Sequence, residues 1–139
     1  MPPESCWLLK TEPGTYSWED LVRDKRTVWD GISNPLALKN MRSASRGDEL
    51  LIYHTGNERR VLGIARIAKA AYPDPKLKDA KRLVIDVEAV KPLAEPVTLE
   101  QIKTDAAFSG WDLLRLSRLS FLPVPAPMRN KLLALAKTR

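Results

Sequence analysis

Several stretches of the chain alternate hydrophobic and polar residues with a period of two. The clearest is 83–89, where positions 83, 85, 87 and 89 are apolar and positions 86 and 88 are acidic. This period is typical of a β-strand that is buried on one face. With bounding turn residues as a second criterion, we predict strands over residues 6–11, 27–29, 49–55, 60–68, 83–89 and 119–124. We expect Pro92 and Pro96 to end the strand that begins at residue 83.

Helices are predicted where a residue that can accept a hydrogen bond from a free backbone amide precedes a helix-compatible run. Ser17 precedes two acidic residues, Asn34 precedes Pro35, and Thr98 begins a third such segment. Near the end of the chain, apolar residues at positions 128, 132 and 135 have the spacing of an amphipathic helix. These signals predict helices over about 17–24, 34–41, 99–105 and the C-terminal segment, a helical turn at 111–114, and an exposed loop at 73–81.

Short strands with short helices at their ends define the expected fold class. With 139 residues, one domain covering 1–139 is expected. The order of elements predicts a mainly β structure with flanking helices (α+β), built on a small curled sheet or barrel.

The composition narrows the possible functions. A single cysteine, Cys6, cannot form an internal disulfide, and one cysteine with one histidine cannot supply a structural zinc site. No apolar run approaches the length of about 20 residues that a membrane span needs, and residues 1–5 lack the layout of a secretory signal. We therefore expect a reduced, cytoplasmic protein without a metal, a cofactor or a membrane partner.

The net charge of +6 is unevenly distributed. Residues 1–30 carry four basic and six acidic side chains, whereas residues 31–139 have a balance of +8. A basic surface of this kind suits a polyanion such as nucleic acid, because each neutralised phosphate releases counterions. Simple solubility is an equally good explanation of the charge.

The residues contain no strong signal for catalysis. Cys6 and His54 could form a nucleophile and base, and Glu12 and Asp30 could do acid–base work. Each has a commoner structural explanation, because free cysteines are usually buried and carboxylates at turns usually cap or form ion pairs. We therefore expect that the chain is not an enzyme.

Trp29 is the most suggestive candidate for binding. It ends an extended segment and is followed by Asp30, Gly31, Ser33 and Asn34. A flat ring beside polar groups can stack on a planar heterocycle while the polar groups read its edge. The alternative is that Trp29 belongs to the core and that Asn34 only caps a helix.

Several motifs resemble those of the EVE domain family. They are WLLKTEP at 7–13, YSWEDL at 16–21, VWDGISNP at 28–35, GD at 47–48, YHTG at 53–56, GIA at 63–65, AYPD at 71–74, the strand at 87–93, and SRLS at 117–120. The resemblance implies a PUA-like curved β-barrel, related to the YTH domains, that binds a modified base in RNA or DNA and has no catalytic activity.

The resemblance also implies positions for the site. Trp29 would form a wall of the base pocket. Six residues would lie close to the base edge: Asp30, Asn34, Lys10, Glu12, Tyr53 and His54. Ser117 and Arg118 would close the pocket or reach a phosphate.

The chain departs from the family pattern in two places. Family members usually have Gln-Ala-Arg-Asn after the Asn-Pro pair, where this chain has Leu36, Ala37, Leu38 and Lys39. Residues 81–83 lack the Trp or Tyr that relatives often carry. Two other functions stay open at this point: a small hydrolase or glycosylase that acts on modified nucleotides, with Glu12 or Asp30 as base, and a module that binds a small molecule or a protein.

Overall fold

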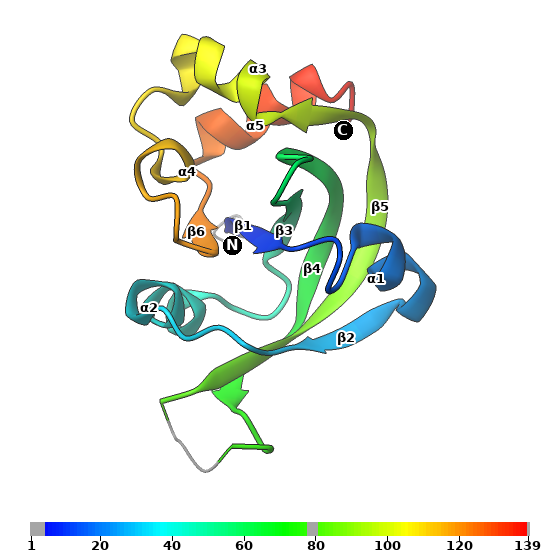
Figure 1. Ribbon diagram of the computed structural model, residues 1–139, viewed down its shortest axis with the longest axis vertical. Helices are drawn as coiled ribbons and strands as arrows, with labels where there is room; N and C mark the ends of the chain where they lie inside the picture. The colour runs from blue at the N-terminus through cyan, green and yellow to red at the C-terminus, as the bar shows by residue number, and fades with distance from the viewer. Residues whose placement is uncertain (1–4, 78–80, 139) are drawn as a thin grey trace.

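A computed structural model describes residues 5–77 and 81–138, which form one curved, mixed β-sheet flanked by helices (Figure 1). Its elements, in chain order, are β1 (Cys6–Thr11), α1 (Trp18–Asp24), β2 (Arg26–Trp29), α2 (Pro35–Ser43), β3 (Glu49–His54), β4 (Arg60–Pro73), β5 (Leu83–Thr98), α3 (Leu99–Thr104), the 3₁₀ turn η1 (Ala106–Phe108), α4 (Asp112–Arg115), β6 (Phe121–Pro123) and α5 (Ala126–Leu135). The expected class, mainly β with flanking helices, is confirmed.

The strand order is β2-β5-β4-β3-β1-β6, so β2 and β6 are the edges of the sheet. Strands β1 and β3 are parallel, and the other neighbours are antiparallel. Of the expected curled sheet or barrel, the structure has the curved sheet, which over the described residues is not closed into a barrel. Between its edges lies α2, whose Asn40 side-chain amide donates to the Phe121 carbonyl of β6 at 2.9 Å.

Strand β5 continues through both prolines that we expected to end it. The register between β4 and β5 shifts between the pairs Val61–Val97 and Gly63–Pro92. Strand β2 pairs with β5 over residues 85–88, and beyond that point no strand among the described residues pairs with this edge of β5. A proline is tolerated at such a bulge or edge, because its missing N–H leaves no ladder hydrogen bond unmade.

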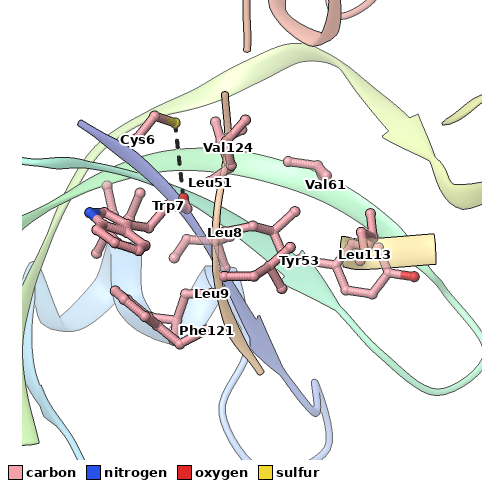
Figure 2. Packing of buried hydrophobic residues seen from close by; sticks show 14 of the residues in the cluster. Cys6, Trp7, Leu8, Leu9, Leu51, Tyr53, Val61, Leu113, Phe121 and Val124 are labelled. Carbon is pink, nitrogen blue, oxygen red and sulfur yellow. Dashed lines mark hydrogen bonds between the residues drawn. The ribbon is translucent and has the colours of Figure 1, made fainter. Parts of the chain in front are cut away.

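Apolar residues from both faces of the central strands form the core. Leu8 and Leu9 of β1 point to opposite faces, yet both are fully buried, because the curved sheet and its helices cover both sides (Figure 2). Trp7 stacks on Phe121 with ring centroids 5.1 Å apart, and its indole N–H donates to Asp48 at 3.0 Å. Strand β1 is thereby fixed between β3 and β6, and its end carries residues of the candidate site.

The helix starts lie where the sequence predicts them. Ser17 caps α1 in a reciprocal box with Asp20, and Asn34 caps α2 by accepting from two backbone amides. The predicted loop at 73–81 is only partly confirmed, because residue 73 belongs to β4 and Asp74 is buried. Residues 78–80 of that loop lie outside the described residues.

Candidate functional site

A cavity of about 410 Å³ lies where the turn before α1 meets the end of β2. Its volume falls within the usual range for small-ligand pockets. It is lined by Thr11, Thr15, Tyr16, Thr27, Val28, Trp29, Asp30 and Lys76. Of the residues proposed from the sequence, the cavity brings together Trp29 and Asp30.

Two aromatic rings line this cavity. Trp29 pairs with Ile85 at the end of β2, and only 9% of it is exposed. Tyr16 meets it edge-on, with centroids 5.7 Å apart and an interplanar angle of 89°. The Tyr16 hydroxyl donates to Asp24 at 2.8 Å, and that contact connects the ring to the far end of α1. The structure therefore combines both interpretations of Trp29, which packs in the core and also lines a cavity.

Asp30 and Lys76 are the charged side chains that line the cavity. Within residues 5–77 and 81–138, neither side chain forms a hydrogen bond or an ion pair, so both are available to a ligand. Lys76 was missed in the sequence, where it lies in the segment predicted to be an exposed loop. A turn positions it, because the buried Asp74 carboxylate accepts from the Lys76 backbone amide at 2.9 Å.

A second cavity, of about 470 Å³, shares Thr27, Val28, Asp30 and Lys76 with the first and is therefore its neighbour. The wall of the second cavity includes three hydrogen-bonded polar side chains. The Asp86 carboxylate accepts hydrogen bonds from the Arg26 guanidinium at 2.8 Å and from the Tyr72 hydroxyl at 2.5 Å. Burial acts to raise the pKa of Asp86, but the hydrogen bonds from Arg26 and Tyr72 outweigh it and lower this pKa.

Lys10 of β1 and its register partner Tyr53 of β3 lie on the other face of the sheet. Successive side chains of a strand point to opposite faces, so Lys10 points away from Thr11, which lines the first cavity. The Lys10 ammonium donates to the Ser117 carbonyl at 3.1 Å and lies 5.9 Å from the centroid of the Tyr53 ring. Burial lowers the pKa of Lys10. The structure thus separates these two residues from Trp29.

Asn34, Ser117 and Arg118 line a third cavity, of about 310 Å³, with Leu36, Arg115, Leu116 and Leu119. The side-chain oxygen of Asn34, Oδ1, is already occupied, because it accepts from the amides of residues 36 and 37. Arg115 pairs with Asp112 at 2.7 Å, whereas Arg118 has no ion pair within the part of the chain that the structure describes. This cavity is therefore cationic, and it is a different place from the cavity of Trp29.

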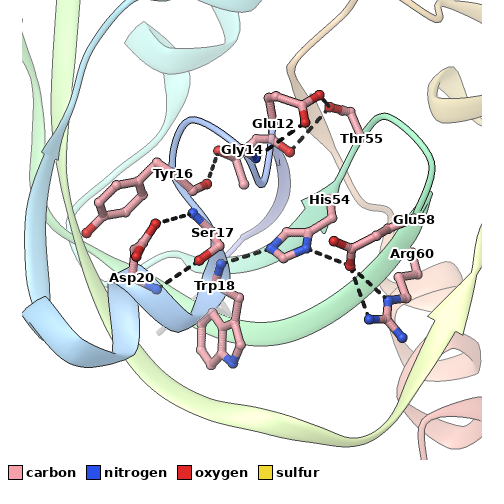
Figure 3. Close-up of polar contacts among 11 residues, drawn as sticks. Glu12, Gly14, Tyr16, Ser17, Trp18, Asp20, His54, Thr55, Glu58 and Arg60 are labelled. Atoms are coloured by element: carbon pink, nitrogen blue, oxygen red, sulfur yellow. Dashed lines mark hydrogen bonds and ion pairs between the residues drawn. The ribbon is translucent and has the colours of Figure 1, made fainter.

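His54 and Glu12 both bind the chain itself (Figure 3). His54 is 1% exposed, and its Nε2 accepts from the Trp18 amide at 2.9 Å while its Nδ1 lies 3.0 Å from Glu58 Oε1. Glu12 accepts from the Thr55 hydroxyl at 3.1 Å and from the Gly14 amide at 3.4 Å. Neither residue lines the first cavity.

Neither of the two candidate catalytic pairs comes together in one cavity. Cys6 pairs with Glu49 at one end of the β1–β3 ladder and His54 with Thr11 at the other, so roughly 16 Å of strand separates them. Burial, with added repulsion from Glu49, raises the pKa of the Cys6 thiol far above its ordinary value. Of the carboxylates in the second pair, only Asp30 lines the first cavity.

Residues 5–77 and 81–138 offer neither a metal site nor a membrane-spanning helix. They contain no group of three or more His, Cys, Asp or Glu side chains that could hold a metal ion. None of their helices is long and apolar enough to cross a membrane.

Comparison with known proteins identifies relatives along nearly the whole chain. The model of the EVE domain family matches residues 5–135. Thymocyte nuclear protein 1 of mouse is 28% identical over 95% of this chain and 74% of the mouse protein. The chain spans only 42–56% of the same protein from rat, human, chicken and zebrafish.

Solved structures agree with this result. An NMR structure of a protein from Rhodopseudomonas palustris is 34% identical with a TM-score of 0.91, and the match covers 96% of this chain and 93% of that one. Human THYN1 protein in complex with DNA containing 5-methylcytosine is 27% identical with a TM-score of 0.88, covering 98% and 99%.

A YTH domain from Zygosaccharomyces rouxii, in complex with N6-methyladenosine RNA, shares the fold alone, with a TM-score of 0.61 and 18% identity over 100% of this chain and 88% of that one. The expected likeness in fold to a YTH domain is thereby confirmed.

Proposed function

The chain belongs to the EVE domain family, and from this membership we propose that it is a non-catalytic module that binds nucleic acid and accepts one modified base in the cavity of Trp29. The observation that carries the proposal is the pair of rings, Tyr16 and Trp29, beside the unpaired carboxylate of Asp30. The complex of the human relative with methylated DNA supports a modified cytosine as one candidate ligand.

Each group has a role in this proposal. Trp29 and Tyr16 contact the base, and Asp30 accepts a hydrogen bond from an N–H on its edge. The third cavity, with Ser117 and Arg118, binds a backbone phosphate, and Lys10 adds positive charge through its contact with Ser117. Asn34, Glu12, Tyr53 and His54 then act indirectly, by fixing the backbone around these groups.

The energies favour a single-stranded or mispaired substrate. Stacking a base on an aromatic ring contributes about 1–3 kcal/mol, and extruding a base from a duplex costs a few kcal/mol. Stacking on Trp29 therefore only offsets extrusion. One added methyl group contributes roughly 0.8 kcal/mol, which is about a fourfold preference. A sharper preference requires the hydrogen bond to Asp30.

The test is a comparison of affinities for short single-stranded DNA and RNA with and without one modified base, measured by fluorescence anisotropy. Removing any acidic residue strengthens non-specific binding to a polyanion, so Asp30→Ala needs a control of equal charge. Glu100→Ala, on exposed helix α3, provides it. We expect Asp30→Ala to reduce the preference for the modified base about tenfold, as loss of a charged hydrogen bond does, and Glu100→Ala to leave it unchanged.

Equal affinity of the unaltered protein for modified and unmodified strands would refute the proposal. Trp29→Ala is a poor test by itself, because truncating a buried tryptophan costs about 3–5 kcal/mol of stability and its loss of binding would have two explanations.

The unpaired Asp30 carboxylate favours one alternative, a glycosylase or hydrolase that uses it as a base. Incubation with the same modified strands, followed by chromatography for released base or nucleoside, separates the two functions. We expect no release, and turnover that disappears in Asp30→Ala would establish the enzyme instead.

The cellular location of the protein is a proposal separate from its binding function. The curated relatives carry the name thymocyte nuclear protein 1, whereas the composition of this chain predicts a cytoplasmic location.

A further inference from the structure

Trp18 makes two of the contacts that hold helix α1 against the sheet, beside the buried Leu21. Its ring packs on the backbone of Gly63 in β4, and its backbone N–H donates to His54 Nε2 at 2.9 Å (Figure 3). The first amides of a helix have no partner within the helix. Ser17 satisfies the Asp20 amide, and His54 satisfies the Trp18 amide from another part of the chain.

The hydrogen bonds of His54 define which ring nitrogen carries the proton. A backbone N–H can only donate, so Nε2 must be unprotonated in order to accept. The Glu58 carboxylate, which also accepts from Arg60 at 3.1 Å, can accept from Nδ1 at 3.0 Å. The ring is therefore neutral and carries its proton on Nδ1.

We propose that His54, in this Nδ1–H form, is a positioning residue that holds α1 where Tyr16 completes the cavity beside Trp29. The predicted effect of His54 on nucleic-acid binding rests on the proposed function, whereas its predicted effect on the arrangement of the Tyr16 and Trp29 rings does not.

The connection from His54 to the cavity runs through α1 itself. The Tyr16 carbonyl accepts from the Thr11 hydroxyl at 2.6 Å, so the backbone before the helix is attached to β1. The Tyr16 ring is instead attached to the helix, because its hydroxyl donates to Asp24, the last residue of α1. A helix that shifts at Trp18 moves Asp24 and with it the Tyr16 ring.

Two substitutions of His54 separate its two contacts. The amide oxygen of glutamine reaches about as far as Nε2, so His54→Gln keeps an acceptor for Trp18 and loses the donor to Glu58. The amide nitrogen of asparagine reaches about as far as Nδ1, so His54→Asn keeps the donor to Glu58 and loses the acceptor for Trp18. Each variant is the matched control of the other.

The first measurement uses the unaltered protein and needs no ligand. The chain has one histidine, so the histidine signals in a long-range ¹H–¹⁵N spectrum of the ¹⁵N-labelled protein at neutral pH belong to the His54 ring without further assignment. We expect Nδ1 to be protonated and Nε2 to be bare. A proton on Nε2 overturns the proposal, whatever the variants do.

The second measurement follows the cross-peaks between the Tyr16 and Trp29 rings and the affinity for a modified strand. We expect His54→Gln to keep the cross-peaks and to bind within about twofold of the unaltered protein. His54→Asn should lose the cross-peaks and bind about tenfold more weakly. Equal loss in both variants, or retention in His54→Asn, contradicts the proposed role. If the unaltered protein binds no modified strand, the proposed function fails, and the cross-peaks still decide the role of His54.

Discussion

The contact between α1 and β4 leads to a sharp prediction for Gly63→Ala. An alanine Cβ at this position would lie 2.4–2.6 Å from three ring atoms of Trp18, a separation that real Cβ atoms essentially never show. The ring cannot move freely, because Trp18 is 5% exposed and its backbone amide is bound to His54. The substitution therefore forces α1 away from the sheet or moves the ring out of its site.

We expect Gly63→Ala to lower the free energy of unfolding, whereas a glycine-to-alanine substitution with room for the added methyl group would raise it. Alanine is about 0.5–1 kcal/mol more favourable than glycine inside a strand, so without a clash Gly63→Ala would stabilise the protein. Overpacking of a well-packed core costs about 1–3 kcal/mol. For a chain of this length, a loss of that size lowers Tm by roughly 4 °C for each kcal/mol.

Denaturant and thermal unfolding of Gly63→Ala and Gly14→Ala provide the test. Gly14 is the matched control, because the nearest atom to its added Cβ is a Glu12 side-chain oxygen at 3.8 Å. We expect a loss of stability for Gly63→Ala only. Adding Trp18→Leu should make Gly63→Ala less costly, with a coupling energy of about 1–3 kcal/mol. A Gly63→Ala protein as stable as the unaltered one would refute the packing argument, and with it the docking of α1.

Three other measurements each test one contact. The hydrogen bond to Asp86 raises the pKa of Tyr72 to about 12. The contribution of this hydrogen bond to the free energy of unfolding is therefore complete below a pH of about 10, the pKa of tyrosine in the unfolded chain, and is lost as the pH rises through about 12. A tyrosinate absorbance titration of Tyr72→Phe should lack that late step, and an unchanged titration contradicts the assignment. Because Cys6 is buried with a raised thiol pKa, a disulfide reagent should modify it only as the protein unfolds. Fast labelling of the folded protein would show that the Cys6 thiol is accessible and contradict its burial. Arg118→Met should reduce the slope of log affinity against log salt by about 0.7, the value for one phosphate on a single strand, and an unchanged slope would remove Arg118 from the interface.

The local signals in the sequence located most of the fold. Capping residues work through amides two or three positions away, so Ser17 and Asn34 mark the starts of α1 and α2 correctly. The period-two pattern after residue 83 located β5 but not its end. That end depends on whether β5 has a neighbour on each side at Pro92, and this information lies in the pairing of β2 and β4, far away in the sequence.

The candidate site was predicted less completely, because it depends on which faces of the sheet meet. Trp29 and Asp30 follow one another and line one cavity together. Period two already places Lys10 and Thr11 on opposite faces of β1, but which of the two faces carries the cavity depends on the neighbours of β1 in the sheet. Lys76 reaches the cavity only because the buried Asp74 fixes the turn after β4. A charged residue in a loop has no feature that predicts this position.

The departure from the family pattern in α2 changes how the third cavity obtains its charge. Leu38, at the position where the family resemblance implies arginine, is buried, and Leu36 is 41% exposed at the cavity. Helix α2 therefore contributes an apolar side chain to the third cavity. The positive charge of this cavity depends on Arg115 and Arg118. Because Arg115 is paired with Asp112, Arg118 is the group with charge to offer a phosphate. An arginine introduced at the exposed position by Leu36→Arg should raise the salt slope by about 0.7 and compensate for Arg118→Met; failure to compensate would show that the phosphate lies elsewhere.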